Sequence, residues 1–338
     1  MTAQRTGTAA TVSRSDRPDR ALEDRSDRSD RSDRSDREIV DAALDRLPEF
    51  RGLSRHVVRV PGGLTNRSYK VTPSSGPTVV VRLASGKSSL LAIDRAAECH
   101  NANAAARAGV APRVIACEPT EGVSVVEWIN GQTLGPVDLD DSTQLSRIAA
   151  TCARLHRGPR FANDFDMFAI QRGYLAVVTE QQFRLPERYL TFQPQVEVIR
   201  TALRVQAERT VPCHNDLLAA NIMDDGRQVW FIDYEYSGNN DPCFELGNIW
   251  SESNLGPDRL DELVNAYFGH PSRAKLARAR LLALMSKYGW TLWASIQNAV
   301  SEVEFDFWSW GMEKYERAVA EFDGPDFSRL IDDVQQPD

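Results

Sequence analysis

Hydrophobic residues early in the chain recur first at helical spacing and then in alternation. EIVDAALDRLPEF at residues 38–50 repeats apolar positions every three to four residues and predicts a helix. HVVRVPGGLTNRSYKVT at residues 56–72 alternates apolar and polar positions and is interrupted by Gly62 and Gly63. This alternation predicts two strands joined through a glycine turn.

Two further strands and a second helix follow in the same part of the chain. TVVVRLA at residues 78–84 and VSVVEWI at residues 123–129 predict strands, and an alanine-rich helix is predicted over residues 94–110 between them. The pattern predicts an α+β lobe with an antiparallel sheet over residues 38–129. Helical patterns dominate afterwards, so residues 130–338 are predicted to form a mostly helical second lobe.

The N-terminal region, residues 1–37, has a different composition. It contains DRSDRSDRSDRSDR at residues 24–37, which is too polar to bury a core and predicts a disordered tail. Each arginine of the repeat has an aspartate beside it, so no positive field builds up. The chain has a net charge of -8 and a pI of about 5.3, which argues against nucleic-acid binding and leaves room for a cationic substrate.

The cysteines and the apolar runs give an expectation for location. Five cysteines lack C-x-x-C spacing, and the odd number favours reduced thiols in the cytoplasm over a disulfide framework. The chain contains neither the apolar segment of a signal peptide nor about 18 consecutive apolar residues that would span a bilayer. We therefore expect a cytoplasmic protein without membrane insertion.

One stretch, HNDLLAANIMDDGRQVWFID at residues 214–233, gathers oxygen-bearing side chains around a turn. Its central DDGR predicts a hairpin, which brings Asn221 and Asp233 to the same open end, with Asp216 just upstream. Mg²⁺ usually takes one or two protein carboxylates and fills its other positions with phosphate oxygens and water. Spacing alone leaves two alternatives open, a magnesium site and an ordinary polar hairpin.

The motifs HNDLLAANI and IDYE resemble those of the eukaryotic-like small-molecule kinases, which include aminoglycoside phosphotransferases and choline/ethanolamine kinases. GGLTNRSYKV and WTLWASIQNAVSEVEF resemble the choline/ethanolamine kinases more narrowly. The resemblance implies a bilobal protein-kinase-like fold that binds ATP and Mg²⁺ between its lobes. It also implies that Asp216 accepts the proton of the acceptor hydroxyl, and that Asn221 and Asp233 hold Mg²⁺.

The resemblance also implies a nucleotide site in the first lobe. The glycine turn would lay backbone N–H groups over the phosphates, Arg82 would bind phosphate with Glu98 as its partner, and the hinge backbone would meet adenine. The implied residues are Gly62, Gly63, Thr65, Asn66, Arg82, Glu98, Glu127 and Ile129. Without the resemblance, the turn is an ordinary hairpin connection and the two charges are exposed surface groups.

Aromatic residues near the C-terminus suggest a site for a cation. Trp290 and Trp293 share one face of a predicted helix, a pattern that by itself indicates core packing, and Trp310 follows. Aromatic faces and a carboxylate recognise a quaternary ammonium, which has no N–H to donate. The resemblance implies a box of these three tryptophans with Glu252 as the carboxylate.

The sequence thus predicts an enzyme, an ATP- and Mg²⁺-dependent kinase that phosphorylates the hydroxyl of choline, with ethanolamine left open. A kinase of another small alcohol is the nearest alternative, acting on an aminoglycoside, thiamine or an amino sugar. A non-catalytic pseudokinase that only binds its ligand is a third hypothesis. The substrate is expected to be a cationic small molecule.

Overall fold

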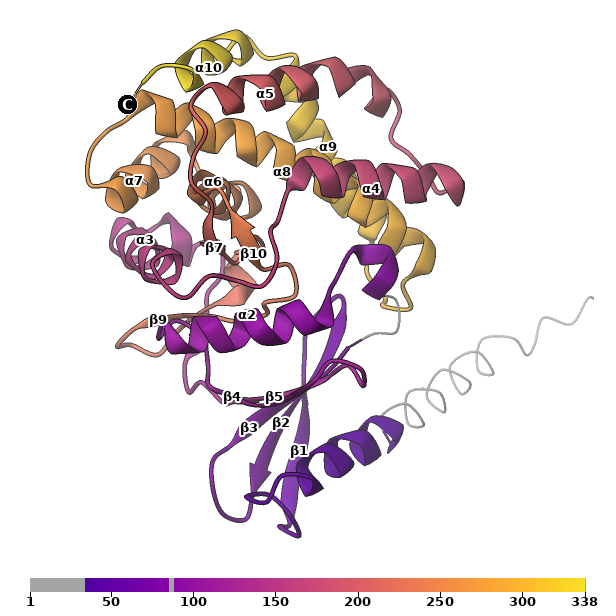
Figure 1. Ribbon diagram of the computed structural model, residues 1–338. Coiled ribbons are helices and arrows are strands. Elements are labelled where there is room, and N and C mark those ends of the chain that lie inside the picture. Colours follow the sequence, from indigo (N-terminus) through magenta and orange to yellow (C-terminus); the bar gives the residue numbers. More distant parts are fainter. Residues whose placement is uncertain (1–33, 85–87, 338) are drawn as a thin grey trace, which may run out of the picture.

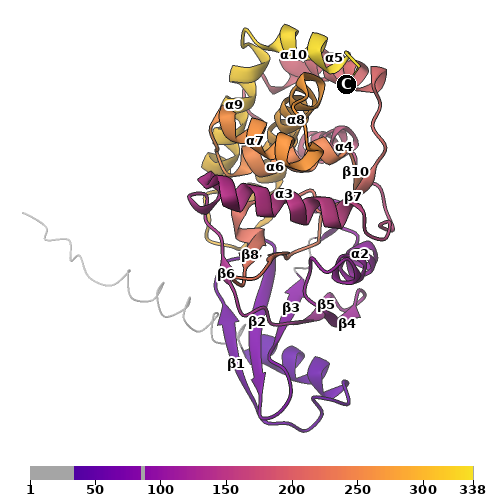
Figure 2. The same cartoon turned by 90° about the vertical axis from the view of Figure 1, so that its left-hand side faces the viewer.

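The smaller lobe is built on a five-stranded antiparallel sheet with the order β1-β2-β3-β5-β4. The computed structural model describes residues 34–84 and 88–337. Figures 1 and 2 show this sheet at one end of the molecule and a helical lobe at the other. The strands are β1 (Arg55–Val60), β2 (Asn66–Pro73), β3 (Val79–Ala84), β4 (Val114–Glu118) and β5 (Val123–Glu127). The predicted antiparallel sheet is confirmed, with β4 as a strand that the apolar pattern did not reveal.

A helix over residues 34–45 packs on one face of this sheet. Its Val40 and Leu44 are completely buried against strand residues such as Val71 and Val81. Alternation along β3 then turns Arg82 to the opposite face, which looks into the space between the lobes. Within β3, the alternating pattern therefore separates a face packed against the helix from a face that borders the space between the lobes.

The predicted boundary of the N-terminal tail at residue 37 is wrong, because residues 34–37 are helical. Asp36 is buried and accepts hydrogen bonds from Arg67 at 2.5 and 2.9 Å and from the Tyr69 hydroxyl at 2.7 Å. A bidentate arginine partner explains why an aspartate of the polar repeat is held against the sheet. The remainder of the predicted tail, residues 1–33, lies outside the described residues.

The larger lobe is mostly helical, as predicted, and contains small antiparallel sheets near the junction with the first lobe. Its helices are α3 (Ser142–His156), α4 (Met167–Glu180), α5 (Gln193–Val205), α6 (Pro242–Glu252), α7 (Pro257–Phe268), α8 (Arg273–Val300), α9 (Phe307–Phe322) and α10 (Phe327–Val334). Its strands are β6 (Gln132–Thr133), β7 (Val211–Cys213), β8 (Ile222–Asp224), β9 (Val229–Phe231) and β10 (Gly238–Asn240). Short 3₁₀ helices are η1 (Ser88–Leu91), η2 (Asp138–Asp140), η3 (Tyr189–Phe192) and η4 (Ala219–Asn221).

The central helix of the larger lobe is α8, which is buried along most of its length. It packs against α4, α6, α9 and α10. Helix α2 (Arg95–Arg107) of the smaller lobe contributes Ala104 and Ala105 to the same apolar core, so it joins the two lobes. Within residues 34–84 and 88–337, a bilayer-spanning helix, long and apolar enough for the purpose, is not found.

The cysteines differ from the expectation that all are reduced. Cys99 on α2 and Cys117 on β4 form a disulfide with a Cα–Cα distance of 6.0 Å, which is ordinary for such a bond. Cys152, Cys213 and Cys243 are free and buried. The scattered spacing concealed this pair because a helix and a strand that are adjacent in space bring them together.

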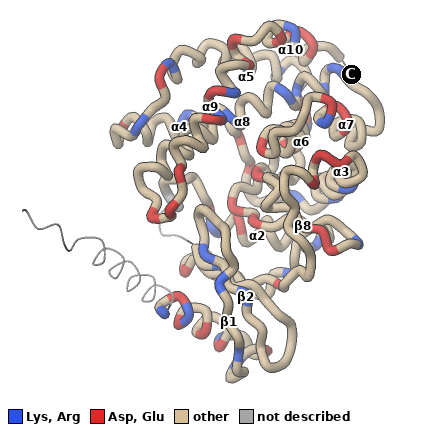
Figure 3. Tube along the Cα trace, turned by 180° about the vertical axis from the view of Figure 1, so that it is seen from behind, with Lys and Arg blue, Asp and Glu red and all other residues tan. Residues whose placement is uncertain are grey.

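Acidic and basic side chains are distributed over both lobes. In Figure 3, blue and red positions are both scattered over the sheet lobe and the helical lobe. The mixed signs agree with the composition, in which 48 acidic residues outnumber 40 basic ones. The expectation that the protein does not bind nucleic acid stays a prediction.

Candidate active site

The hairpin predicted around residues 224–227 is present. β8 and β9 pair antiparallel with Ile222 opposite Phe231, and the N–H of Ile232 donates to the carbonyl of Asn221 at 3.0 Å. The turn is held by Asp225 and passes through Gly226 at a φ of 83°. Asn221 therefore lies beside the segment that leads directly into Asp233, as the spacing predicted.

Asp216 lies against the same hairpin end. The Asn221 side-chain amide donates to the Asp216 carbonyl at 2.8 Å and to its carboxylate at 3.4 Å. The preceding residue, Asn215, has a φ of 67° and its amide donates to the carbonyls of Cys213, Tyr236 and Gly238. These bonds hold the loop in a left-handed conformation that asparagine tolerates.

Glu245 on α6 fixes the backbone of the loop that leads into Asp216. Its two carboxylate oxygens accept the N–H groups of His214 at 2.8 Å and Asn215 at 2.7 Å. Glu245 is completely buried, and His156 approaches it at 3.6 Å. Burial raises the pKa of Glu245, but the hydrogen bonds and charges of His156 and His214 outweigh burial and lower it. Glu245 was not among the residues predicted from the sequence.

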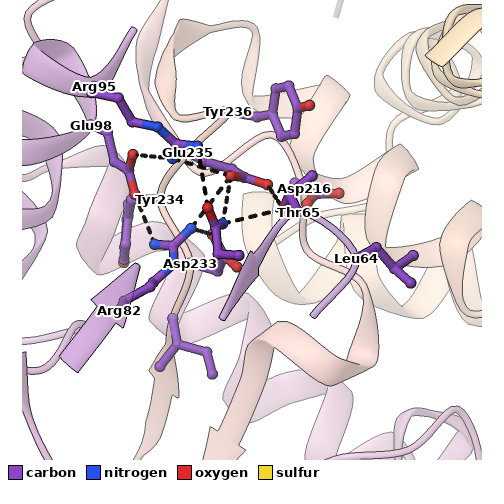
Figure 4. Close-up of polar contacts among 12 residues, drawn as sticks. Leu64, Thr65, Arg82, Arg95, Glu98, Asp216, Asp233, Tyr234, Glu235 and Tyr236 are labelled. Atoms are coloured by element: carbon purple, nitrogen blue, oxygen red, sulfur yellow. Dashed lines mark hydrogen bonds and ion pairs between the residues drawn. The ribbon is translucent and has the colours of Figure 1, made fainter. Parts of the chain in front are cut away.

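Arg82 joins the two lobes through carboxylates (Figure 4). Its guanidinium donates to Glu98 at 2.7 Å and contacts Asp233 and, at 3.4 Å, Glu235. The predicted Arg82–Glu98 pair is thus present, and one arginine contacts the carboxylate that was predicted to bind metal. Arg95 contacts Glu98 at 2.7 Å and Glu235 at 3.3 Å.

The segment that follows the glycine turn also reaches this cluster, through its side chains. Gly62 and Gly63 have φ values of 90° and 86°, which favour glycine. Thr65 donates to one Glu235 oxygen at 2.6 Å, and Asn66 donates to the other at 2.8 Å. Glu235 was not among the predicted residues, although its position two residues after Asp233 in IDYEY was a signal.

Three carboxylates at this site, Asp216, Asp233 and Glu235, have raised pKa values. Burial raises the pKa of Asp216 well above its ordinary value, and the charge of Glu252 adds to the effect before those of Asp233 and Glu235. Burial likewise raises the pKa of Asp233, against the opposing charge of Arg82. Burial and then the charge of Asp233 raise the pKa of Glu235. The site therefore concentrates negative charge that its arginines only partly neutralise.

A cavity of about 210 Å³ opens beside this cluster, between the lobes. Its lining includes five of the predicted residues, namely Arg82, Glu98, Glu127, Ile129 and Asp233. Val80 and Val126 provide apolar walls, and Trp128 lies at the hinge. The Glu127 N–H donates to the Arg113 carbonyl at 2.9 Å, so this donor is already paired.

The predicted tryptophans lie together, with a tyrosine that was not predicted. Trp293 packs edge-on to Trp310 at 5.5 Å and donates its indole N–H to the Tyr236 hydroxyl at 2.8 Å. Tyr236 in turn packs edge-on to Trp290 at 4.9 Å. Trp290 and Trp293 are buried, as the core interpretation of the helical stripe expected. Tyr236 links this aromatic cluster to the loop of Asp216, because the Tyr236 carbonyl accepts a hydrogen bond from the side-chain amide of Asn215.

Glu252, the predicted partner of the substrate cation, is already paired. Its Oε2 accepts from the ammonium of Lys314 at 2.5 Å. That ammonium also lies 4.1 Å from the centre of the Trp310 ring. The sequence analysis missed Lys314, although its position four residues after Trp310 on one helix was a signal.

A sheet lobe over a helical lobe, with a cavity and clustered carboxylates at their junction, is the architecture of a protein-kinase-like phosphotransferase. Residues 57–258 match the choline/ethanolamine kinase family. The matched region exceeds half of the chain, which therefore belongs to the choline/ethanolamine kinase family, enzymes that phosphorylate an alcohol group.

Curated relatives of the chain include bacterial and mammalian proteins. Protein LicA of Haemophilus influenzae is 28% identical over 256 residues, which cover 71% of this chain and 73% of LicA. Ethanolamine kinase 2 of Mus musculus is 29% identical over 290 residues, covering 74% of this chain and 71% of the relative. The relatives thus include an enzyme named for ethanolamine.

Solved structures show the same fold. A choline/ethanolamine kinase family protein from Mesorhizobium loti superposes with a TM-score of 0.77 at 31% identity, covering 88% of this chain and 98% of that one. Choline kinase LicA from Streptococcus pneumoniae superposes with a TM-score of 0.72 at 22% identity, covering 85% and 98%. The expected fold class and the resemblance to this family are both confirmed.

Proposed function

We propose that the protein transfers the γ-phosphoryl group of ATP, with Mg²⁺, to the hydroxyl of choline or ethanolamine. The observation that carries the proposal is the joint position of Asp216, Asn221 and Asp233 at the end of one hairpin, beside a cavity between two lobes. Membership of the choline/ethanolamine kinase family supports the acceptor class. Phosphoryl transfer needs positioning and charge neutralisation more than covalent chemistry from the protein.

The donor groups at the hairpin end fit a hard divalent cation. In the described part of the chain, three carboxylates contact two guanidinium groups here, namely Glu98, Asp233 and Glu235 around Arg82 and Arg95. The charges of Asp233 and Glu235 also act on Asp216. The excess of carboxylates, and the raised pKa values of Asp216, Asp233 and Glu235, favour a further positive charge. We assign Asn221 and Asp233 as the residues that hold Mg²⁺, which would neutralise the phosphate charge.

Asp216 is proposed to orient the acceptor hydroxyl and to accept its proton. Its raised pKa makes its ionised form a better proton acceptor than an exposed aspartate. Asn221 fixes the Asp216 backbone, and Glu245 fixes the two preceding N–H groups. The chain thus holds the carboxylate in place before the alcohol arrives.

The nucleotide is assigned to the cavity between the lobes. The apolar side chains of Val80 and Val126 suit an adenine ring, and the hinge backbone from Glu127 to Ile129 would offer it hydrogen bonds. Arg82 would meet the phosphates, and the backbone at Gly62 and Gly63 would cover them. Thr65 and Asn66 are assigned a supporting role, because their side chains bind Glu235.

We also propose a cytoplasmic location, where ATP is available as a phosphoryl donor. The number of cysteines no longer supports this location, because Cys99 and Cys117 are paired. The proposed division into lobes at residues 129 and 130 follows the hinge that lines the cavity.

An ADP-release assay tests the proposed function. Purified protein with Mg²⁺ and ATP is mixed separately with choline, ethanolamine, thiamine and an aminoglycoside, and the phosphorylated product is identified by mass. We expect ADP and a phosphorylated amino alcohol in equal amounts. Turnover with only thiamine or an aminoglycoside would show that the acceptor belongs to another class of alcohol. Binding of ATP without any turnover would identify a pseudokinase.

A further inference from the structure

The ammonium of Lys314 occupies a position between a carboxylate and an aromatic face. It lies 2.5 Å from Oε2 of Glu252, at the end of α6, and 4.1 Å from the ring centre of Trp310, one turn earlier on α9. Both members of the ion pair have side chains that are only 6% exposed. This is an enclosed ion pair, in which water does not replace either partner easily.

Glu252 and Trp310 are the two kinds of group that recognise a substrate ammonium ion. An aromatic face attracts a cation within about 6 Å of its centre, and Lys314 satisfies this condition. A quaternary ammonium that used the same face and the same carboxylate oxygen would have to displace a cation that is tethered to the protein. The tether gives Lys314 a high effective concentration at this position.

One oxygen of Glu252 lacks a donor in the described part of the chain. Oε1 is buried, and none of the residues that the structure describes donates a hydrogen bond to it. A buried acceptor without a partner is unfavourable, because it has lost water without gaining a replacement. A ligand that carries an N–H group relieves this deficit, whereas a trimethylammonium group has no hydrogen to donate.

The Lys314 and Glu252 pair lies next to the proposed chemistry. Trp310 contacts Trp293, and Trp293 donates to the hydroxyl of Tyr236, whose carbonyl accepts from Asn215 beside Asp216. The charge of Glu252 also raises the pKa of Asp216, after burial, and that of Lys314 lowers it. An ethanolamine-sized molecule is short enough to need both its hydroxyl and its ammonium within this small region.

We propose that Lys314 determines substrate specificity: by occupying Trp310 and one oxygen of Glu252, it leaves the other oxygen to select amino alcohols whose ammonium retains an N–H. The inference rests on the proposed function and refines it, because it assigns ethanolamine and its partly methylated forms as preferred acceptors over choline. Glu252 then binds two ammonium groups, one from the protein and one from the substrate.

A methylation series on the wild-type protein tests this assignment. The kcat/KM is measured for ethanolamine and for its N-methyl, N,N-dimethyl and N,N,N-trimethyl derivatives, the last of which is choline. We expect similar values for the three that retain an N–H and a drop of about tenfold or more at choline, where the last donor to Glu252 is lost. Recognition by aromatic faces alone predicts the opposite trend, a rise with each methyl group, and would overturn the proposal.

Lys314→Met tests the role of the lysine itself. Removing the ammonium frees Trp310 and Oε2 of Glu252, so kcat/KM for choline should rise and the ethanolamine-to-choline ratio should fall by about tenfold. Lys287→Met is the matched control. Lys287 is also a buried lysine, 2.5 Å from Glu321 and 5.2 Å from the ring centre of Trp250. Its charge acts on Glu252 only at a distance, because its ion pair and ring contact are with Glu321 and Trp250. This variant should leave the ratio within about twofold of wild type.

The two proposals fail in different ways. Absence of turnover with every amino alcohol would remove the proposed function and this inference with it. Turnover in which choline is the better substrate, or in which Lys314→Met and Lys287→Met have the same ratio as wild type, would remove only the inference. If Lys314→Met does not fold, the methylation series on the wild type decides the question.

Discussion

Arg82 of the sheet lobe contacts the carboxylate of Asp233 in the helical lobe while it donates to Glu98 at 2.7 Å. One guanidinium therefore connects a strand, the helix α2 and the end of the β8–β9 hairpin. The planar fork of arginine allows both contacts at once, which a lysine ammonium on a flexible stem does not reproduce. Since Arg82 also lines the interlobe cavity, this connection bears directly on the proposed nucleotide site.

Arg82→Lys is expected to raise the KM for Mg·ATP about tenfold or more. The variant keeps the charge but loses the simultaneous bridge to Glu98 and Asp233. Arg147→Lys is the control, because Arg147 binds Asp224 through both terminal nitrogens away from the cavity. Equal KM values in the two variants would show that the bridge does not serve the nucleotide.

Asp216→Asn is expected to lower kcat by about 10²–10⁴-fold and to raise thermal stability slightly. Burial raises the folded-state pKa of Asp216 above its unfolded-state pKa. The contribution of Asp216 to the free energy of unfolding is therefore fully present below the unfolded pKa and is lost as pH rises through the folded pKa. Above that folded pKa the wild type bears the cost of a buried charge that asparagine avoids, about 1 kcal/mol or ~2 °C in Tm. Calorimetry over a pH series checks this, and the Tm difference should grow as pH rises and vanish in acid. A wild-type kcat would exclude Asp216 as the base.

Glu245→Gln is expected to lower both stability and kcat. Glutamine offers one acceptor and one NH₂ group, so one of the N–H groups of His214 and Asn215 loses its partner. The free energy of unfolding should fall by about 1–3 kcal/mol, measured by urea denaturation. Glu197→Gln removes an exposed pair with Arg200 on α5 and should change stability by less than about 1 kcal/mol. Rescue of kcat in Glu245→Asp would support a positioning role.

Reduction of Cys99–Cys117 is expected to lower stability by about 3 kcal/mol, because the bond closes a loop between residues 18 apart in sequence. Urea denaturation with and without dithiothreitol measures the effect. The double variant Cys99→Ser with Cys117→Ser should match the reduced wild type and should not respond to dithiothreitol. A wild type that is insensitive to dithiothreitol would contradict the expectation.

Local sequence patterns were sufficient to predict much of the fold. Alternation in residues 56–72 gave β1 and β2, and DDGR gave the hairpin, because strand periodicity and turn chemistry are properties of adjacent residues. The same hairpin brought Asn221 beside the segment entering Asp233. The family resemblance supplied the remaining step from an α+β lobe and a helical lobe to one kinase-like fold.

The missed features depend on residues that are distant in sequence. Glu235 binds Thr65 at a separation of 170 residues, and Lys314 binds Glu252 at a separation of 62. Neither pair leaves a periodic signal, since only the packing of helices and lobes brings the side chains together. The same reason explains why Asp36, within a polar repeat, was not expected to find Arg67.

The central claim is that Asp216, Asn221 and Asp233 support Mg²⁺-dependent phosphoryl transfer to an amino alcohol. The most direct measurement is the amount of ADP and of phosphorylated ethanolamine formed from ATP by wild type and by Asp233→Asn, with and without Mg²⁺. We predict equal amounts of both products for the wild type with Mg²⁺, and a loss of at least about 10²-fold in the variant or without the metal. Turnover by Asp233→Asn at the wild-type rate would contradict the account.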